Sequence, residues 1–124
     1  MTQPLVPLDK RLLEFAIAVG AATRTMPRDP AGRAIAAQLS RSGMAPAANY
    51  AEARDAVSGR EYAFKLQLCL KELRETMVWI RVAKGNGFSN ADYAALEQEC
   101  HELTAILVTC VRKAKARLQV APRR

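Results

Sequence analysis

The chain has 124 residues and a formal net charge of +7, from 19 Lys and Arg against 12 Asp and Glu. This length suits one domain and excludes a second. Half of the residues are hydrophobic but only 6% are aromatic, and the abundance of Ala and Leu favours helices over a sheet. The basic excess favours acidic partners such as nucleic acid, although it also fits a soluble protein that is simply basic.

Catalytic, metal and membrane signatures are missing from the sequence. Cys69, Cys100 and Cys110 form no CxxC pair, so we expect buried structural thiols rather than a disulfide framework or a metal site. The longest apolar run, residues 103–111, is too short to span a membrane, and we expect a cytoplasmic protein. With one histidine, His101, no phosphate-binding glycine loop and no Ser-His-Asp set, we predict no enzyme and no cofactor.

The first predicted helix covers residues 8–25, after a flexible lead-in of residues 1–7. Its apolar residues recur at alternating steps of four and three, which is typical of one face of an amphipathic helix. These residues are Leu8, Leu12, Phe15, Val19, Ala22 and Met26.

The second predicted helix covers residues 30–56. Asp29 followed by Pro30 is typical of an N-cap and a first helical residue. Pro46 lies inside this helix, where it removes one backbone hydrogen bond, so we expect a kink near residues 43–45.

The third predicted helix begins at the capping box Ser58-Gly59-Arg60-Glu61 and ends near residue 84, before the stop signal of Gly85 and Gly87. Its apolar seam consists of Tyr62, Leu66, Cys69, Leu73, Met77 or Thr76, and Ile80.

The fourth predicted helix follows a capping sequence at residues 89–92 and ends near residue 117, before a basic flexible tail of residues 118–124. Its seam steps by three and four without a break. The seam residues are Tyr93, Leu96, Cys100, Leu103, Leu107, Cys110 and Ala114.

Four consecutive helices with short connections predict an all-α protein, an up-down-up-down antiparallel four-helix bundle over residues 8–117. The third and fourth helices also carry apolar residues away from the main seam. A second apolar stripe is typical of a subunit contact, so we expect an oligomer. The off-seam residues are Trp79, Val82, Ile106, Val108 and Val111.

Basic residues concentrate on the third helix and at the end of the fourth. The fourth helix is acidic in its first half and basic in its last turns, which complements the helix dipole. The same basic turns could contact phosphates. The candidate nucleic-acid-binding residues are Lys65, Arg74, Arg81, Lys84, Arg112, Lys113, Lys115 and Arg117.

Polar residues also occur at core-like spacing on the second and third helices. One interpretation is a buried hydrogen-bond network with Asn49 and Glu52 facing Lys65 or Glu72, because unpaired burial is costly. A functional groove is a second interpretation. A di-metal carboxylate site is a third, but the Glu-x-x-His pattern it needs is absent, and the predicted metal set is none. The candidate network residues are Gln38, Ser42, Asn49, Glu52, Lys65, Glu72 and Glu75.

A succession of short motifs runs through the second and third predicted helices. The motifs are Gln38-Leu39-Ser40-Arg41-Ser42-Gly43, Ala48-Asn49-Tyr50-Ala51-Glu52-Ala53, Ser58, Glu61, Lys65-Leu66, Leu70-Lys71-Glu72-Leu73-Arg74-Glu75-Thr76 and Trp79. This succession resembles the small four-helix-bundle proteins encoded by intervening sequences of bacterial 23S rRNA genes, and the resemblance spans roughly residues 8–117. The accessory variability protein of diversity-generating retroelements is a more distant relative.

The resemblance implies a bundle that assembles into a ring-like homopentamer. For the retroelement relative, it implies a basic surface that binds nucleic acid and a reverse transcriptase. The chain departs from the family where Ala45, Pro46 and Ala47 replace a Ser-aliphatic-Gly sequence, which alters the expected bend of the second helix.

Our leading hypothesis is therefore a non-enzymatic, oligomeric bundle that binds RNA or DNA, as an accessory to a ribonucleoprotein or a reverse transcriptase. The alternative is a protein-interaction or scaffold module that binds no nucleic acid. A ligand-binding or metal-binding bundle is a third hypothesis, which predicts small molecules or metal bound to the purified protein.

Overall fold

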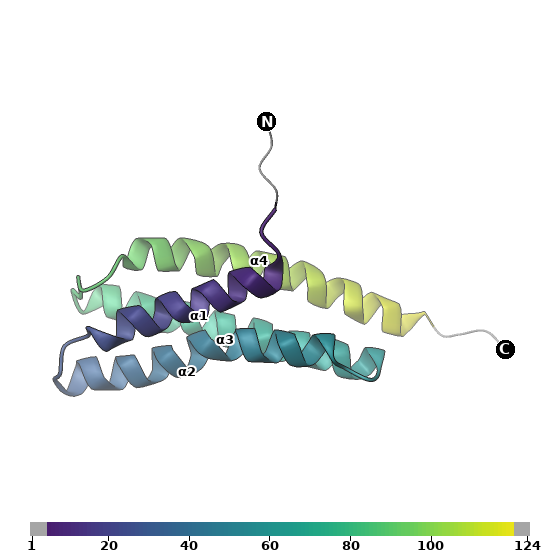
Figure 1. Ribbon diagram of the computed structural model, residues 1–124, viewed down its shortest axis with the longest axis horizontal. Helices are drawn as coiled ribbons and strands as arrows, with labels where there is room; N and C mark the ends of the chain where they lie inside the picture. Colours follow the sequence, from purple (N-terminus) through teal and green to yellow (C-terminus); the bar gives the residue numbers. More distant parts are fainter. Residues whose placement is uncertain (1–4, 121–124) are drawn as a thin grey trace.

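The computed structural model describes residues 5–120, and this part of the chain is all-helical (Figure 1). It contains no β-strand among those residues, so the predicted fold class is confirmed at that level. The four helices are α1 (Leu8–Arg24), α2 (Pro30–Arg54), α3 (Gly59–Gly85) and α4 (Tyr93–Gln119).

Side-chain caps fix where α2, α3 and α4 begin. The Asp29 carboxylate accepts a hydrogen bond from the Gly32 amide at 2.8 Å, and the Ser58 hydroxyl accepts one from the Glu61 amide at 3.1 Å. Asp92 caps α4 by accepting from the Ala95 amide at 3.0 Å. Each such cap contributes about 1 kcal/mol to helix stability.

The ends of the helices differ slightly from the prediction. Gly87, at φ +78°, follows α3 and supplies the expected stop. By contrast, α4 continues to Gln119, so the tail predicted from residue 118 begins too early. Leu118 lies 3.4 Å from the position of a Cβ added to Gly59, and this neighbour helps to explain why the last turn stays helical. Residues 1–4 and 121–124 of the predicted lead-in and tail lie outside the described residues.

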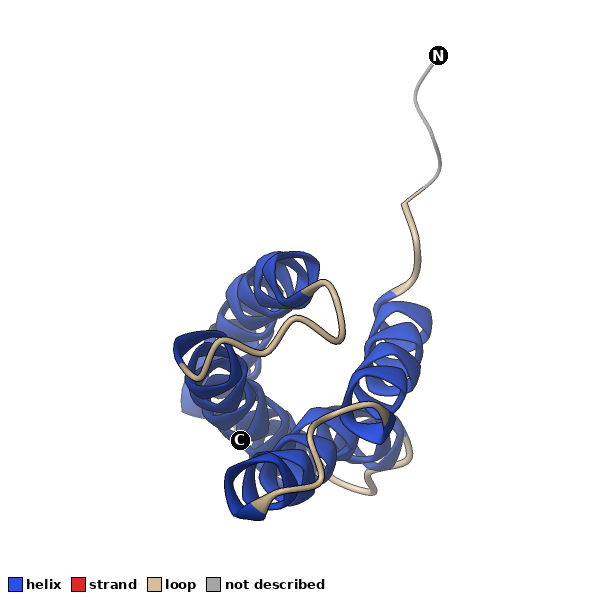
Figure 2. Ribbon diagram, turned by 90° about the vertical axis from the view of Figure 1, so that its left-hand side faces the viewer, coloured by secondary structure: helices blue, strands red, loops and turns tan. Residues whose placement is uncertain are grey.

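The helices pack mainly on their neighbours in the chain, and α4 also contacts α1. Figure 1 shows the α1–α2 and α3–α4 connections at one end of the molecule and the α2–α3 connection at the other. In Figure 2, which looks along the helices, they surround a common centre. No helix among residues 5–120 is both long and apolar enough to cross a lipid bilayer.

The core forms where the predicted seams of α1, α3 and α4 meet, with a few corrections. Leu8 and Tyr62 are half-buried, Thr76 is buried in preference to its half-buried alternative Met77, and Val111 is buried where Cys110 was predicted. Because an α-helix has 3.6 residues per turn, a strict four-three step drifts by one position along a long helix. The largest fully buried side chains include Leu12, Leu39, Leu66, Leu73, Ile80, Leu103 and Leu107.

The apolar residues that suggested a subunit contact lie elsewhere than expected. Val111 belongs to the core, and the other four are half-buried against it. The exposed large hydrophobic residues within the helices are others, mostly on α1 and α3. They are Leu13 (55% exposed), Ile17 (63%), Met44 (43%), Phe64 (58%), Val78 (54%) and Leu118 (46%).

Helix α2 has no long apolar seam. Apart from Ile35 and Leu39, its buried residues are glycines, Ser42, Pro46 and Ala53. A Cβ added to Gly43 would lie 2.8 Å from both methyl carbons of Val19, so this glycine allows α1 and α2 to approach closely. Helix α2 continues without interruption through the buried Pro46, whose carbonyl accepts a hydrogen bond from the Cys69 thiol at 3.5 Å.

Candidate functional site

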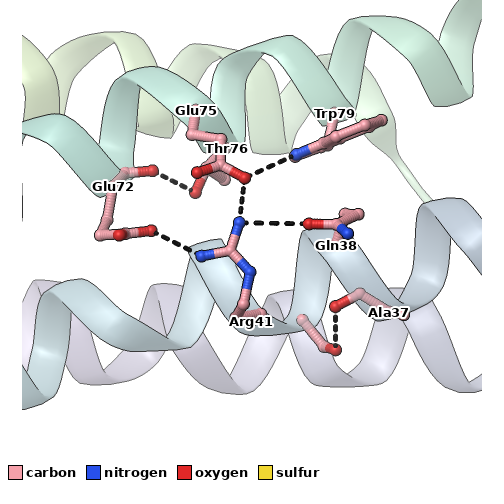
Figure 3. Close-up of polar contacts among 8 residues, drawn as sticks. Ala37, Gln38, Arg41, Glu72, Glu75, Thr76 and Trp79 are labelled. Carbon is pink, nitrogen blue, oxygen red and sulfur yellow. Dashed lines mark hydrogen bonds and ion pairs between the residues drawn. The ribbon is translucent and has the colours of Figure 1, made fainter.

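Arg41 is the centre of a polar cluster between α2 and α3 (Figure 3). Its guanidinium donates to the side-chain amide oxygen of Gln38 and to the Glu72 carboxylate, both at 3.2 Å, and it also pairs with Glu75. The Trp79 indole N–H donates to the same Glu75 oxygen at 3.0 Å. The Glu72 carboxylate is 17% exposed and the Arg41 side chain 50% exposed, so this cluster lies at the edge of the helix contact.

The structure brings some of the predicted network residues together and separates others. Gln38, Glu72 and Glu75 share Arg41, whereas Glu52 forms its own ion pair with Lys65 at 3.1 Å. The Ser42 hydroxyl is fully buried and has no hydrogen-bond partner among the described residues. Asn49 is half-buried and belongs to neither set of contacts. Arg41 was missed, although two unpaired carboxylates at core-like spacing call for a cation on the facing helix.

Within residues 5–120, no group of three or more His, Cys, Asp or Glu side chains lies close enough to hold a metal ion. The carboxylates of Glu72 and Glu75 instead point to the guanidinium of Arg41.

Three of the predicted nucleic-acid-binding residues form ion pairs within the bundle. Lys65 pairs with Glu52, while Arg81 and Lys84 both pair with Glu97. Hydrogen bonds from Lys84 and then from Arg81 lower the pKa of the Glu97 carboxyl below its ordinary value. A cation that is already paired offers less charge to a phosphate, so these three residues are weaker candidates.

The remaining candidates carry cations without an ion-pair partner among residues 5–120, and four of them gather at one end of α4. In Figure 1 this end of α4 extends beyond the α2–α3 connection. All four side chains are exposed. We call this set the basic end of α4: Arg112, Lys113, Lys115 and Arg117.

The α2–α3 connection lies beside the basic end of α4. A pocket of about 520 Å³ between them is lined by Val57, Ser58 and Gly59 on one side and by Arg117 and Leu118 on the other. The neighbouring Arg60, the second residue of α3, is exposed as well and has no ion-pair partner within the described residues. The basic surface at this end of the bundle therefore consists of cationic side chains from two helices, α3 and α4.

Residues 9–109 match the family described as 23S rRNA-intervening sequence protein. The chain belongs to this family. Among curated proteins no sequence matches the chain. A crystal structure of a protein of unknown function from the S23 ribosomal protein family of Bacteroides thetaiotaomicron VPI-5482 is similar, with a TM-score of 0.77 and 24% sequence identity, over 85% of this chain and 98% of that one. At this identity the likeness supports the shared fold.

Membership of the 23S rRNA-intervening sequence protein family confirms the resemblance drawn from the motifs of the second and third helices. Those motifs include Arg41, Glu72, Glu75 and Trp79, which the structure joins in one polar cluster. In this chain the motif residues therefore hold α2 against α3, while the basic end of α4 lies beyond the matched residues.

Proposed function

We propose that the protein is a non-enzymatic, cytoplasmic, up-down-up-down four-helix bundle that forms a homopentamer and binds RNA or DNA. The phosphate contacts come from the basic end of α4, together with Arg60. The observation that supports this proposal is the separation of the candidate cations into a paired group and an unpaired group.

Phosphate binding through these cations follows from simple electrostatics. Each Lys or Arg that neutralises a phosphate releases condensed counterions, so the logarithm of the binding constant falls by about 0.9 per contact and per unit of log salt on duplex DNA, and by about 0.7 on single strands. Such contacts carry little sequence information. Several copies in one assembly would place several basic ends on the same nucleic acid and raise the overall affinity.

The test is a titration of the purified protein against labelled RNA and duplex DNA at two salt concentrations. We expect binding at low salt, with a steep salt dependence and little dependence on sequence. Absence of binding to both nucleic acids at low salt contradicts the proposal.

Two variants of equal charge locate the contact. Lys113→Gln with Arg117→Gln removes unpaired cations, and Arg81→Gln with Lys84→Gln removes cations paired with Glu97. We expect the first variant to bind at least about tenfold more weakly and to lose about 0.9 of the salt slope per contact on duplex DNA. The second variant should stay close to the original protein. Equal losses in both variants would place the binding surface elsewhere.

A further inference from the structure

A groove lies between α1 and α4. It has a volume of about 510 Å³, and its floor is formed mainly by alanines. Because alanine side chains are short, the backbones of α1 and α4 leave space that their own side chains do not fill. We call this space the α1–α4 groove, and its floor includes Phe15, Ala18, Ala21, Ala22, Ala95 and Leu96.

Polar contacts hold the α1–α4 groove at both of its ends. At one end, Arg11 pairs with Glu99 at 2.5 Å and with Glu102 at 3.1 Å. At the other end, the Asn90 side-chain amide donates to the Ala22 carbonyl at 2.8 Å and to the Thr25 hydroxyl at 3.0 Å. The groove is thus a fixed feature of the fold, since α1 is tied to α4 at two separate points.

The rim of the α1–α4 groove is acidic. Glu14 from α1 and Asp92 and Glu99 from α4 line it. Glu99 is paired with Arg11, whereas Glu14 and Asp92 form no ion pair with any residue in the range 5–120. Ile17, which is 63% exposed, lies on the outer side of α1 beside these residues. The surface therefore suits a helix that presents apolar side chains together with cations.

The outer face of α3 has this composition. Phe64 and Val78 are 58% and 54% exposed, and they are separated by two heptads, or about 21 Å along a helix. The cations on the same face form no ion pair within residues 5–120, and Glu72 and Glu75 of α3 pair with Arg41 of α2 instead. We call this face the α3 outer stripe: Phe64, Lys71, Arg74 and Val78.

We propose that the α1–α4 groove of one copy binds the α3 outer stripe of a second copy of this chain, and that Lys71 and Arg74 meet the carboxylates of Glu14 and Asp92 across the contact. The proposal rests on the oligomer of the proposed function and assigns its surfaces. Within one chain, the backbone of α1 packs on α2 and α4 and not on α3. Because the groove and the stripe are two different surfaces, the contact between copies is heterologous, and it generates a closed ring when the rotation between copies closes.

The charge pattern selects the second copy over an unrelated partner helix. The groove rim offers the carboxylates of Glu14 and Asp92, of which Asp92 also caps α4, while the matching stripe has only cations and two large apolar residues. Burying Phe64 and Val78 against alanines would remove apolar surface from water at both sites. This assignment also moves Arg74 from the nucleic-acid surface to the contact between copies.

Complementary mixing tests the proposal on the full-length protein. One variant carries Phe64→Glu and Val78→Glu, and the other carries Ala18→Arg in the groove. We expect each variant to behave as a single subunit in a native mass measurement, with a helical circular-dichroism spectrum. An equimolar mixture should form a one-to-one heterodimer, because each variant retains one intact surface. Val57→Glu, at a position 93% exposed outside both surfaces, should keep the mass of the original protein.

Charge reversal provides a second test that does not depend on apolar substitutions. Glu14→Lys and Lys71→Glu should each weaken assembly about tenfold, and the double variant should recover most of that loss. Retention of the original mass by every single variant would overturn the assignment of surfaces while leaving the oligomer intact. A single-subunit mass for the original protein would instead contradict the oligomer of the proposed function. Loss of RNA binding without loss of assembly in the Phe64 and Val78 variant would make the stripe a nucleic-acid contact and overturn the proposal.

Discussion

Helix α1 packs in opposite ways on its two neighbours. Toward α2, Val19 lies against Gly43, and a single added Cβ there would already be 2.8 Å from its methyl carbons. Toward α4, alanines face alanines, and a groove of about 510 Å³ remains. Small residues thus close a helix contact only where a large side chain faces them. The α1–α2 contact stabilises the bundle, and the α1–α4 contact leaves surface for a partner.

Truncation of a fully buried leucine of α2 should produce the largest effect. Leu39 of α2 is fully buried, so Leu39→Ala removes apolar contacts and leaves a cavity. We expect a loss of about 2–5 kcal/mol in the free energy of unfolding. Urea unfolding followed by circular dichroism measures it, and a loss below about 0.5 kcal/mol would show that α2 is not closely packed there.

Adding a methyl group at the α1–α2 contact should reduce the free energy of unfolding by a smaller but still measurable amount. In Gly43→Ala, the new Cβ would clash with Val19, and α1 and α2 would have to separate. We expect a loss of about 1–3 kcal/mol from this overpacking, although alanine favours the helix over glycine by about 1 kcal/mol. The same unfolding experiment applies.

The control for Gly43→Ala is Ala21→Leu, which places a larger side chain in the contact between α1 and α4. Ala21 is exposed and lines the α1–α4 groove, which has room for the added carbons. The free energy of unfolding of the single subunit should change by less than about 0.5 kcal/mol. Equal destabilisation by Gly43→Ala and Ala21→Leu would remove the distinction between the two contacts of α1.

Loss of the polar contact at one end of the α1–α4 groove should cost less than truncation of Leu39 or enlargement at Gly43. Asn90→Ala removes the hydrogen bonds to the Ala22 carbonyl and the Thr25 hydroxyl, and also the partner of the Tyr93 hydroxyl. We expect a loss of about 1 kcal/mol, with faster amide hydrogen exchange in the last turn of α1. Unchanged exchange in that turn would show that Asn90 does not tie α1 to α4.

The buried thiols predict a small loss of stability at alkaline pH. Burial raises the pKa of Cys69 to about 12 and that of Cys100 to about 11, from an ordinary value of 9.0. The folded protein therefore retains protons that the unfolded chain releases, so this contribution is complete below pH 9 and is lost as the pH rises through the folded values. Unfolding by urea at about pH 8 and about pH 10 should show the decrease, and Cys100→Ala should reduce it. A stability that rises between those two pH values would contradict the burial of both thiols.

The periodicity of apolar residues was sufficient to predict the four helices and most of the core, because Leu12, Leu66 and Leu103 recur at steps that place them on one face. The packing of α2 could not be predicted in this way. Its core positions include Gly43 and Pro46, which no hydrophobic pattern distinguishes from turn residues.

The polar cluster could be predicted only in part. Spacing selected Glu72 and Glu75, but their cation, Arg41, occupies an exposed position and follows no polar stripe. Ion pairing also separates the candidate cations into paired and unpaired residues, because Arg81 and Lys84 bind Glu97 across the α3–α4 contact. Sequence spacing does not give such contacts between helices. The α1–α4 groove was missed for the same reason, since alanines on two separate helices must face each other to form it.

Zero-length cross-linking with a carbodiimide tests most directly whether the open side of α1 receives a second copy. This reagent joins a lysine amine to a carboxylate in direct contact, and Lys71 and Glu14 are exposed on α3 and α1, two helices whose backbones do not pack on each other within one chain. Peptide mass spectrometry of an isotope-mixed sample should find Lys71 joined to Glu14 or Asp92 between light and heavy copies. A cross-linked oligomer whose intermolecular links all avoid the α1–α4 groove would contradict the account.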